Sequence, residues 1–176
     1  TTMTFVEDDI LILQKSDGVV RLIQDGILQD KPVLDVNVDS AGEKGMLGIT
    51  SVGTTVYLYY TEANEDGGES LGNRIYKYEW TGDSLVHPEL LKELPSNISH
   101  NGGAMVVGSD DKVYAIIGDT LGYGLLQNKP LEWLEGDDID LKDNGVILQL
   151  ETDNPYFAMG IRNSFGLAID PDTGNL

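Results

Sequence analysis

The 176-residue sequence contains no cysteine, so it forms no disulfide bond and has no thiolate to hold a metal ion. It also lacks a long hydrophobic run, because no apolar stretch approaches the ~18 residues that a membrane-spanning helix needs. The first residues, Thr1 to Glu7, have neither the basic segment nor the apolar core of a signal peptide. We therefore expect no membrane insertion, and the missing cysteines leave the redox compartment unreadable.

Basic residues are scarce in this chain. Lysine and arginine number 11 against 30 aspartates and glutamates, which gives a formal net charge of −19. A surface this acidic repels the phosphates of nucleic acids and of anionic membranes, so a nucleic-acid partner is excluded. The carboxylates are scattered along the chain, which favours a solvated acidic surface over a cation-binding tail. The hydrophobic fraction of 40% is that of a globular protein.

Proline is sparse, with 6 residues, glycine is frequent, with 21, and no convincing long helical pattern is present. Short β-branched and aromatic runs alternate with Gly, Asp and Asn turns, a pattern typical of antiparallel strands. The predicted strands cover 10–13, 19–23, 56–60, 74–80, 113–117 and 145–150. We expect hairpin turns at Asp17-Gly18, Asp25-Gly26 and Asp110-Asp111. Residues 90–94 are expected to form an outer strand rather than a helical turn after Pro88.

The predicted strands recur with a period of about 40–50 residues, which is typical of the blades of a β-propeller. Blade one covers about 3–38, blade two about 46–96, blade three about 100–152, and the start of blade four about 159–176. The polar residues 127–143 are expected to form a long loop over one face. The sequence therefore predicts an all-β, partial β-propeller, with a β-sandwich as the alternative architecture.

Six short motifs follow one another along the chain. They are 42–49 (GEKGMLGI), 56–62 (VYLYYTE), 73–80 (NRIYKYEW), 100–103 (HNGG), 116–119 (IIGD) and 160–168 (GIRNSFGLA). Together they resemble segments of the soluble quinoprotein glucose/sorbosone dehydrogenases, and the resemblance runs from about Thr2 to the last residue. It implies a six-bladed β-propeller that binds pyrroloquinoline quinone (PQQ) and calcium and oxidises aldose sugars. It also implies that about three blades and one strand lie in this chain, and that the calcium ligands lie beyond Leu176.

The motif at 100–103 carries one of the two histidines of the chain. Removing hydride from a sugar hemiacetal requires a base for the hydroxyl proton, and imidazole suits this task because it titrates near neutral pH. The resemblance implies that His100 is this base and that Asp119 orients its second ring nitrogen. From the residues alone, the alternatives are a loop histidine bonded to backbone groups and a strand-end aspartate that begins a turn.

The resemblance also implies that Arg162 and Asn163 contact the cofactor. A guanidinium can hold the planar anionic groups of PQQ and can stabilise charge on a quinone oxygen. Glu43 is expected to contact the sugar or to tune His100. The alternatives are an arginine that ties strands together and a surface glutamate, and no metal ligand is expected from the side chains present.

Two functions of different classes follow from these residues. The first is a PQQ-dependent aldose dehydrogenase, with an aldose sugar and an external electron acceptor as partners, working in an extracellular or periplasmic location as the family usually does. The second is a non-catalytic propeller that binds carbohydrate or protein. An incomplete ring would leave open blade faces. These faces predict one of three arrangements: a longer protein, a partner fragment, or self-association of two copies.

Overall fold

The computed structural model describes residues 2–121 and 143–176, and within them it contains thirteen strands and no helix. Accordingly, nothing in the described part of the chain is a helix long and apolar enough to cross a membrane. The strands pair antiparallel in three sheets, so the predicted all-β class is confirmed for these residues.

The three sheets are meanders in which most strands follow one another in sequence order. Sheet A contains β1 (Met3–Val6), β2 (Asp9–Gln14), β3 (Val19–Gln24), β4 (Ile27–Leu28) and β5 (Leu34–Asp35), the last pairing with β3. Sheet B contains β6 (Met46–Val52), β7 (Thr55–Ala63), β8 (Ser70–Trp80) and β9 (Leu85–Leu94). Sheet C contains β10 (Met105–Val107), β11 (Val113–Ile117), β12 (Val146–Gln149) and β13 (Tyr156–Met159). Every strand predicted from the sequence coincides with or overlaps one of these elements.

Strand β7 shows why sheet B lies between the other two. Residues 56–60 of this strand are all apolar or aromatic, and successive side chains of a strand point to opposite faces of the sheet. Val56, Leu58 and Tyr60 join the core between sheets A and B. Tyr57 and Tyr59 join the core between sheets B and C. Along β7, both faces of sheet B are therefore buried by the hydrophobic effect.

The outer edge of sheet B is β9, which includes Pro88. We expected residues 90–94 to form an outer strand, and the structure extends this strand back to Leu85. Proline has no N–H to donate, so a sheet tolerates it at an edge or a bulge. The pairing of β9 with β8 shifts register next to the proline, where His87 adopts a φ of 53°. The alternative of a helical turn after Pro88 is therefore wrong.

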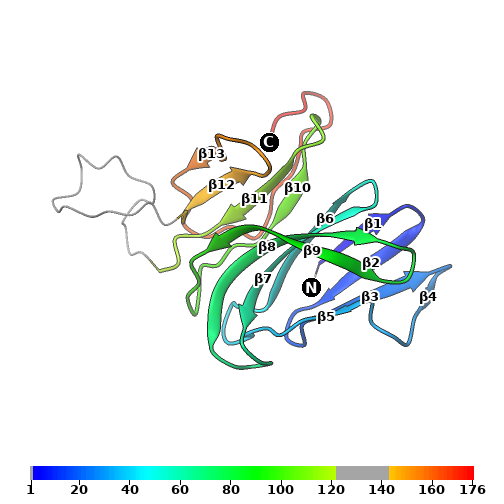
Figure 1. Cartoon of the computed structure of the whole chain (residues 1–176). Helices are drawn as coiled ribbons and strands as arrows, with labels where there is room; N and C mark the ends of the chain where they lie inside the picture. The colour runs from blue at the N-terminus through cyan, green and yellow to red at the C-terminus, as the bar shows by residue number, and fades with distance from the viewer. Residues whose placement is uncertain (1, 122–142) are drawn as a thin grey trace.

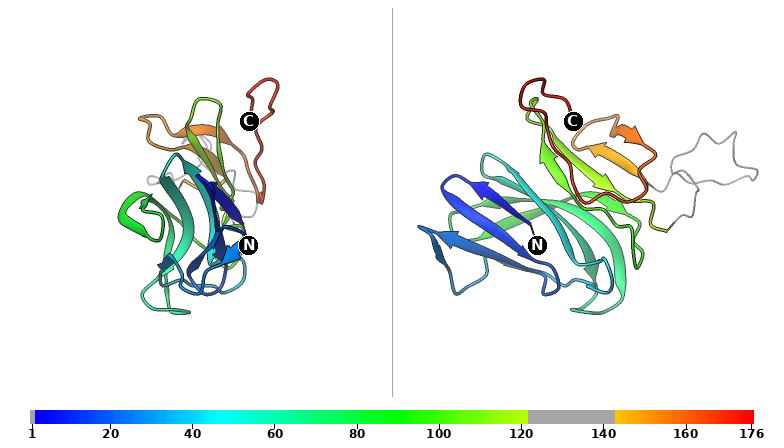
Figure 2. Two further views of the ribbon diagram at one scale, coloured as in Figure 1. Left: turned by 90° about the vertical axis from the view of Figure 1, so that its right-hand side faces the viewer. Right: turned by 180° about the vertical axis from the view of Figure 1, so that it is seen from behind.

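The three sheets pack side by side, with sheet B between sheets A and C (Figure 1 and Figure 2). Strand β6, the first strand of sheet B, contacts both β1 and β10, which are the first strands of the other two sheets. The first strands are therefore innermost and the later strands lie outward, as in the blades of a β-propeller. The predicted partial β-propeller is thus the observed architecture.

Sheet A presents an apolar outer face. The register places Phe5 opposite Ile10 and Leu28 opposite Ile23, so these four side chains share one face. Phe5 is 62% exposed and Leu28 is 54% exposed. An apolar face of this kind is what one propeller blade offers to the next.

The outer face of sheet C is partly covered by the residues that follow β13. Leu167 and Leu176 pack against a cluster formed by Tyr114, Ile116 and Ile147. Residues 160–176 form no strand in the described structure. The start of blade four at about 159–176 and the other blade boundaries therefore stay predictions, and the expected loop at 127–143 lies, except for Asp143, outside the described residues.

A polar cluster joins sheets B and C. Glu151, which follows β12, accepts hydrogen bonds from the hydroxyl of Tyr57 and from Nζ of Lys77, each at 2.7 Å. The hydrogen bonds from Lys77 and Tyr57 hold the pKa of the Glu151 carboxyl below its ordinary value. The same contact to Glu151 raises the pKa of Lys77.

We predict that Glu151→Gln flattens the dependence of the unfolding free energy on pH. A lowered carboxyl pKa stabilises the fold above the ordinary value of 4.5, and this contribution is lost as the pH falls below it. A raised lysine pKa stabilises the fold below the ordinary value of 10.5, and this contribution is lost as the pH rises above it. The Glu151 side chain is 38% exposed, so solvent screening should keep the difference under about 1 kcal/mol.

Urea unfolding at a series of pH values measures this effect. Asp153→Asn is the matched control, because it removes a nearby carboxylate that pairs with no cation in the described part of the chain. The same flattening in Asp153→Asn would show that net charge, and not the Glu151 cluster, sets the pH dependence.

Candidate functional site

The expected site residues come from loops that meet at one edge of the sheets. His100 precedes β10, Asp119 follows β11, Asn163 follows β13 and Glu43 precedes β6. Because neighbouring strands run antiparallel, the start of β10 lies beside the end of β11, and the start of β12 lies beside the end of β13. The topology therefore gathers these loops on the same side of sheet C.

His100 and Asp119 form a short hydrogen bond. His100 Nδ1 lies 2.6 Å from Asp119 Oδ1, and the histidine and aspartate side chains are 13% and 5% exposed. A carboxylate accepts hydrogen bonds, so Nδ1 carries the proton in this pair. The backbone N–H of Leu121 donates to the same oxygen at 3.0 Å and fixes its direction. His100 Nε2 has no hydrogen-bond partner among the described residues, which leaves this nitrogen for a ligand.

The backbone of His100 lies in the left-handed region, with a φ of 63°. For a residue with a Cβ this conformation costs about 1–2 kcal/mol, so the surroundings must hold it. The N–H of His100 donates to Glu43 Oε2 at 2.6 Å, and its carbonyl accepts from the N–H of Thr120 at 3.2 Å. The loop before β6 and the loop after β11 therefore both hold the histidine.

Glu43 also contacts Asn163. The amide Nδ2 of Asn163 donates to Glu43 Oε2 at 3.4 Å, the oxygen that accepts from His100. This contact assigns the amide orientation and leaves Asn163 Oδ1 buried without a donor in the described structure. A buried acceptor without a partner costs about 1–3 kcal/mol unless a ligand supplies the donor. Oε2 of Glu43 is thus engaged by the protein.

Arg162 lies at the same edge, but its side chain joins none of these contacts. Its carbonyl oxygen accepts from the N–H of Asp119 at 2.7 Å. The residue is exposed, and its guanidinium has no partner among residues 2–121 and 143–176. Four other cations pair with carboxylates: Lys44, Arg74, Lys77 and Lys92. In a chain with a net charge of −19, an unpaired guanidinium beside this site is available for an anionic ligand.

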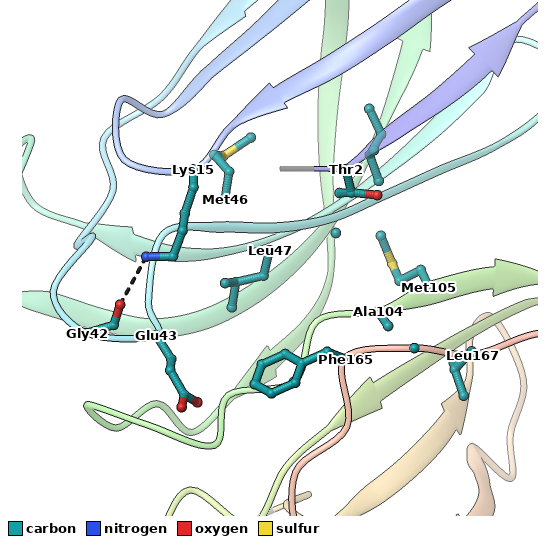
Figure 3. Close-up of a pocket in the computed structure, with 14 residues that line it drawn as sticks. Thr2, Lys15, Gly42, Glu43, Met46, Leu47, Ala104, Met105, Phe165 and Leu167 are labelled. Carbon is teal, nitrogen blue, oxygen red and sulfur yellow. Dashed lines mark hydrogen bonds between the residues drawn. The ribbon is translucent and has the colours of Figure 1, made fainter.

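A pocket of about 470 Å³ lies along the first strands of sheets B and C. Its lining includes Lys15, Glu43, Met105 and Phe165 (Figure 3). Lys15 Nζ donates to the carbonyl oxygen of Gly42 at 3.0 Å, and Phe165 is 70% exposed. Lys15 and Phe165 could not be predicted as pocket residues, because no local sequence pattern shows that the β2–β3 turn and the segment after β13 border the same pocket.

Three buried polar side chains behind His100 were also not predicted as part of the site. Thr61, Asn73 and Asn101 are each 0% exposed and are linked by hydrogen bonds. The hydroxyl of Tyr59 donates to the carbonyl oxygen of Asn101 at 2.9 Å, and burial raises the pKa of Tyr59, which keeps this donor protonated. Asn73 and Asn101 lie inside the motifs 73–80 and 100–103, so the sequence does contain a signal for them. That signal indicates a strand and the histidine motif, but it does not show that the two side chains are hydrogen-bonded to each other.

The fold is that of a β-propeller of the quinoprotein type, and two solved structures share it. A glucose dehydrogenase-type oxidoreductase of Thermus thermophilus matches 98% of this chain and 55% of its own, with a TM-score of 0.75 and 25% identity. The PQQ-bound form of an aldose sugar dehydrogenase of Streptomyces coelicolor matches 97% of this chain and 53% of its own, with a TM-score of 0.73 and 24% identity.

The family is shown by a match over the whole sequence. The model of the Glucose / Sorbosone dehydrogenase family matches residues 1–176, and the chain belongs to this family. Quinoprotein glucose dehydrogenase B of Acinetobacter calcoaceticus is 30% identical over an alignment of 167 residues, and the match covers 76% of this chain and 35% of that protein. The chain thus spans about a third of this curated relative and about half of the solved structures. The resemblance inferred from the six motifs is confirmed.

We predict that Gly118→Ala disrupts the site. A Cβ at Gly118 would lie 2.3 Å from the carbonyl oxygen of His100 and 3.0 Å from that of Arg162, both backbone atoms that cannot move aside alone. Such overpacking should destabilise the protein by about 1–3 kcal/mol, measured by urea unfolding. Gly166→Ala is the control, because a Cβ there meets nothing within 4 Å. Equal stability of the two variants would contradict this close approach.

Proposed function

We propose that this chain belongs to a PQQ-dependent dehydrogenase that oxidises aldose sugars at the anomeric carbon. The observation that carries the proposal is the 2.6 Å hydrogen bond between His100 Nδ1 and Asp119 Oδ1, which leaves Nε2 for a substrate proton. Family membership supports the reaction class. The names of the relatives, a quinoprotein glucose dehydrogenase and a PQQ-bound aldose sugar dehydrogenase, support the cofactor.

The residues at the site fit PQQ in their chemistry. PQQ carries carboxylates, quinone oxygens and a pyrrole N–H. The guanidinium of Arg162, which has no partner in the described structure, could bind its anionic groups with paired hydrogen bonds. The buried oxygen Oδ1 of Asn163 lacks a donor and could accept from the ligand. Arg162 and Asn163 are therefore the residues that we propose for holding the cofactor.

When bound, PQQ would take the hydrogen of the anomeric carbon as hydride. His100 Nε2 would accept the proton of the anomeric hydroxyl, because Nδ1 already carries a proton. Asp119 would hold Nδ1–H and stabilise the imidazolium that forms. Glu43 would keep the ring in place through the backbone N–H of His100, to which it is bonded at 2.6 Å, and its other oxygen is the candidate for a sugar contact.

Calcium is implied by the family resemblance, but the described side chains do not form a site for it. No group of three or more His, Asp or Glu side chains among them could hold a metal ion. No step of the proposed mechanism is therefore assigned to calcium, and its ligands are proposed to lie in other parts of the protein.

The proposed reaction needs an aldose sugar and an external acceptor that takes up the electrons. We place it outside the cytoplasm, in an extracellular or periplasmic location, on the basis of the family resemblance. The alternative of a non-catalytic binding module needs no base, so the buried pairing of His100 with Asp119 favours the enzyme.

We predict that His100→Ala lowers the kcat for aldose oxidation by about 10²–10⁴-fold, the usual contribution of a positioned general base. PQQ-loaded protein would be assayed with an aldose and an artificial acceptor. His87→Ala is the control, because His87 lies exposed on β9, the outer edge strand of sheet B, where it is hydrogen-bonded to Glu79 of β8. Unchanged turnover in His100→Ala would remove the histidine from the reaction, and sugar binding without turnover in the wild-type protein would support the binding module.

We also predict that Arg162→Ala weakens PQQ binding by about 10-fold or more, because a hydrogen bond to a charged group contributes about 1.5–3 kcal/mol. The quinone absorbance during a PQQ titration measures the dissociation constant. Lys112→Ala removes the same charge from the turn between β10 and β11, at the opposite edge of sheet C. Equal weakening in both variants would mean that net charge, and not a contact with Arg162, determines the affinity.

A further inference from the structure

The loop that carries His100 is unusual in its backbone. His100 has a φ of 63°, and two glycines that follow it, Gly102 and Gly103, have φ values of 71° and 104°. Glycine adopts such angles readily, whereas a residue with a Cβ adopts them only where its neighbours impose them. The direction of the His100 side chain therefore depends on the contacts that hold this turn.

Asn101 holds the turn from the inside. Its side chain is fully buried, and Nδ2 donates to the carbonyl oxygen of Asn97 at 2.7 Å. Its Oδ1 accepts from the N–H of Asn97 at 3.0 Å and from Nδ2 of Asn73 at 3.1 Å. Residues 97–101 are thereby closed into a ring of hydrogen bonds, and Asn73 contacts the Asn101 side chain from outside this ring.

Asn73 belongs to β8, in a different sheet from the strand that follows His100. Its Nδ2 donates to Asn101 Oδ1 and, at 2.8 Å, to the carbonyl oxygen of Pro95. Its Oδ1 accepts from the hydroxyl of Thr61 on β7 at 2.7 Å. Both amide protons of Asn73 thus go to the segment around His100, and the oxygen is tied to sheet B.

The amide of Asn73 can work in one orientation only. A flipped amide would point its oxygen at Asn101 Oδ1 and at the Pro95 carbonyl, which are both acceptors. The hydroxyl of Thr61 donates to the side that must accept, which favours the observed orientation. The side chains of Asn73, Thr61 and Asn101 are buried, so water cannot replace a missing partner without a cost.

We propose that Asn73 is a positioning residue for His100. From sheet B it fixes the turn at Asn101, and through this turn it aims the His100 ring at Asp119. Asn73 is hydrogen-bonded to neither the ring nor the carboxylate, so it acts only through its neighbours. The inference rests on the proposed role of His100 as the base. It means that the position of this base depends on sheet B, although the strand that follows His100 belongs to sheet C.

The test is the state of the His100 ring nitrogens, measured by ¹⁵N NMR on histidine-labelled protein without cofactor. Signals of His100 are assigned by their loss in His100→Ala. Asn73→Asp keeps the size and the acceptor for Thr61 but removes the two donated protons, and Thr61→Val removes only the hydroxyl that orients the amide. Val56→Ala is the control, because it opens a cavity on the same strand as Thr61, in the core between sheets A and B.

We expect wild-type His100 to show a single tautomer protonated at Nδ1. Asn73→Asp should shift it to a mixture of tautomers, Thr61→Val should do so to a smaller extent, and Val56→Ala should leave it unchanged. In the loaded enzyme, kcat should fall by about 10-fold or more in Asn73→Asp with little change in KM, since misplacement of a reacting group is costly.

Unchanged His100 signals in folded Asn73→Asp would overturn the proposal, and so would an equal change in Val56→Ala. If Asn73→Asp does not fold, Thr61→Val decides, and a wild-type spectrum in that variant overturns the proposal. The NMR measurement needs no PQQ and no turnover. Failure of the proposed function would show as an active His100→Ala enzyme, which is a separate result.

Discussion

The burial of both faces of sheet B is the constraint on which the site depends. Strand β7 places Val56, Leu58 and Tyr60 in one core and Tyr57 and Tyr59 in the other, so sheets A and C are held on opposite sides of a common neighbour. The loops before β6 and β10 then leave the sheets at the same edge. Glu43 can reach the backbone of His100 only because this packing sets the distance between the two loops.

The site combines rigid polar contacts with unpaired groups. His100, Asp119 and Glu43 are bonded to one another through side chain or backbone, and Asn101 lies fully buried behind them. Against this background His100 Nε2, Asn163 Oδ1 and the Arg162 guanidinium lack partners among the described residues. An imidazole nitrogen, a buried acceptor and a guanidinium are therefore left open at one edge, and these are the groups to which we assign the sugar and the cofactor in the proposed function.

Most of the fold could be predicted because strands and turns are local signals. Alternation in residues 74–80 predicts a strand and the Asp25-Gly26 pair predicts a hairpin without any tertiary information. The structure has β8 over these residues and φ values of 52° and 75° at Asp25 and Gly26. Pro88 was harder, since a proline permits either a helical turn or an edge strand. Pro88 lies at the outer edge of sheet B, where no neighbour in the described structure needs an N–H from this position, and this edge position decided for the strand.

By itself, the sequence determined the all-β class, the repeated units, the acidic surface, and the identity of His100 and Asp119 as a candidate pair through the family motifs. Only the tertiary structure decided that Glu43 binds the His100 backbone, that Arg162 is unpaired among the described residues, and that Asn73 reaches the His100 loop from another sheet. The physical reason is the distance along the sequence over which each interaction acts. Backbone propensity and turn chemistry act over a few residues, whereas Glu43 and His100 are 57 positions apart in the sequence and meet only when packed sheets bring their loops together.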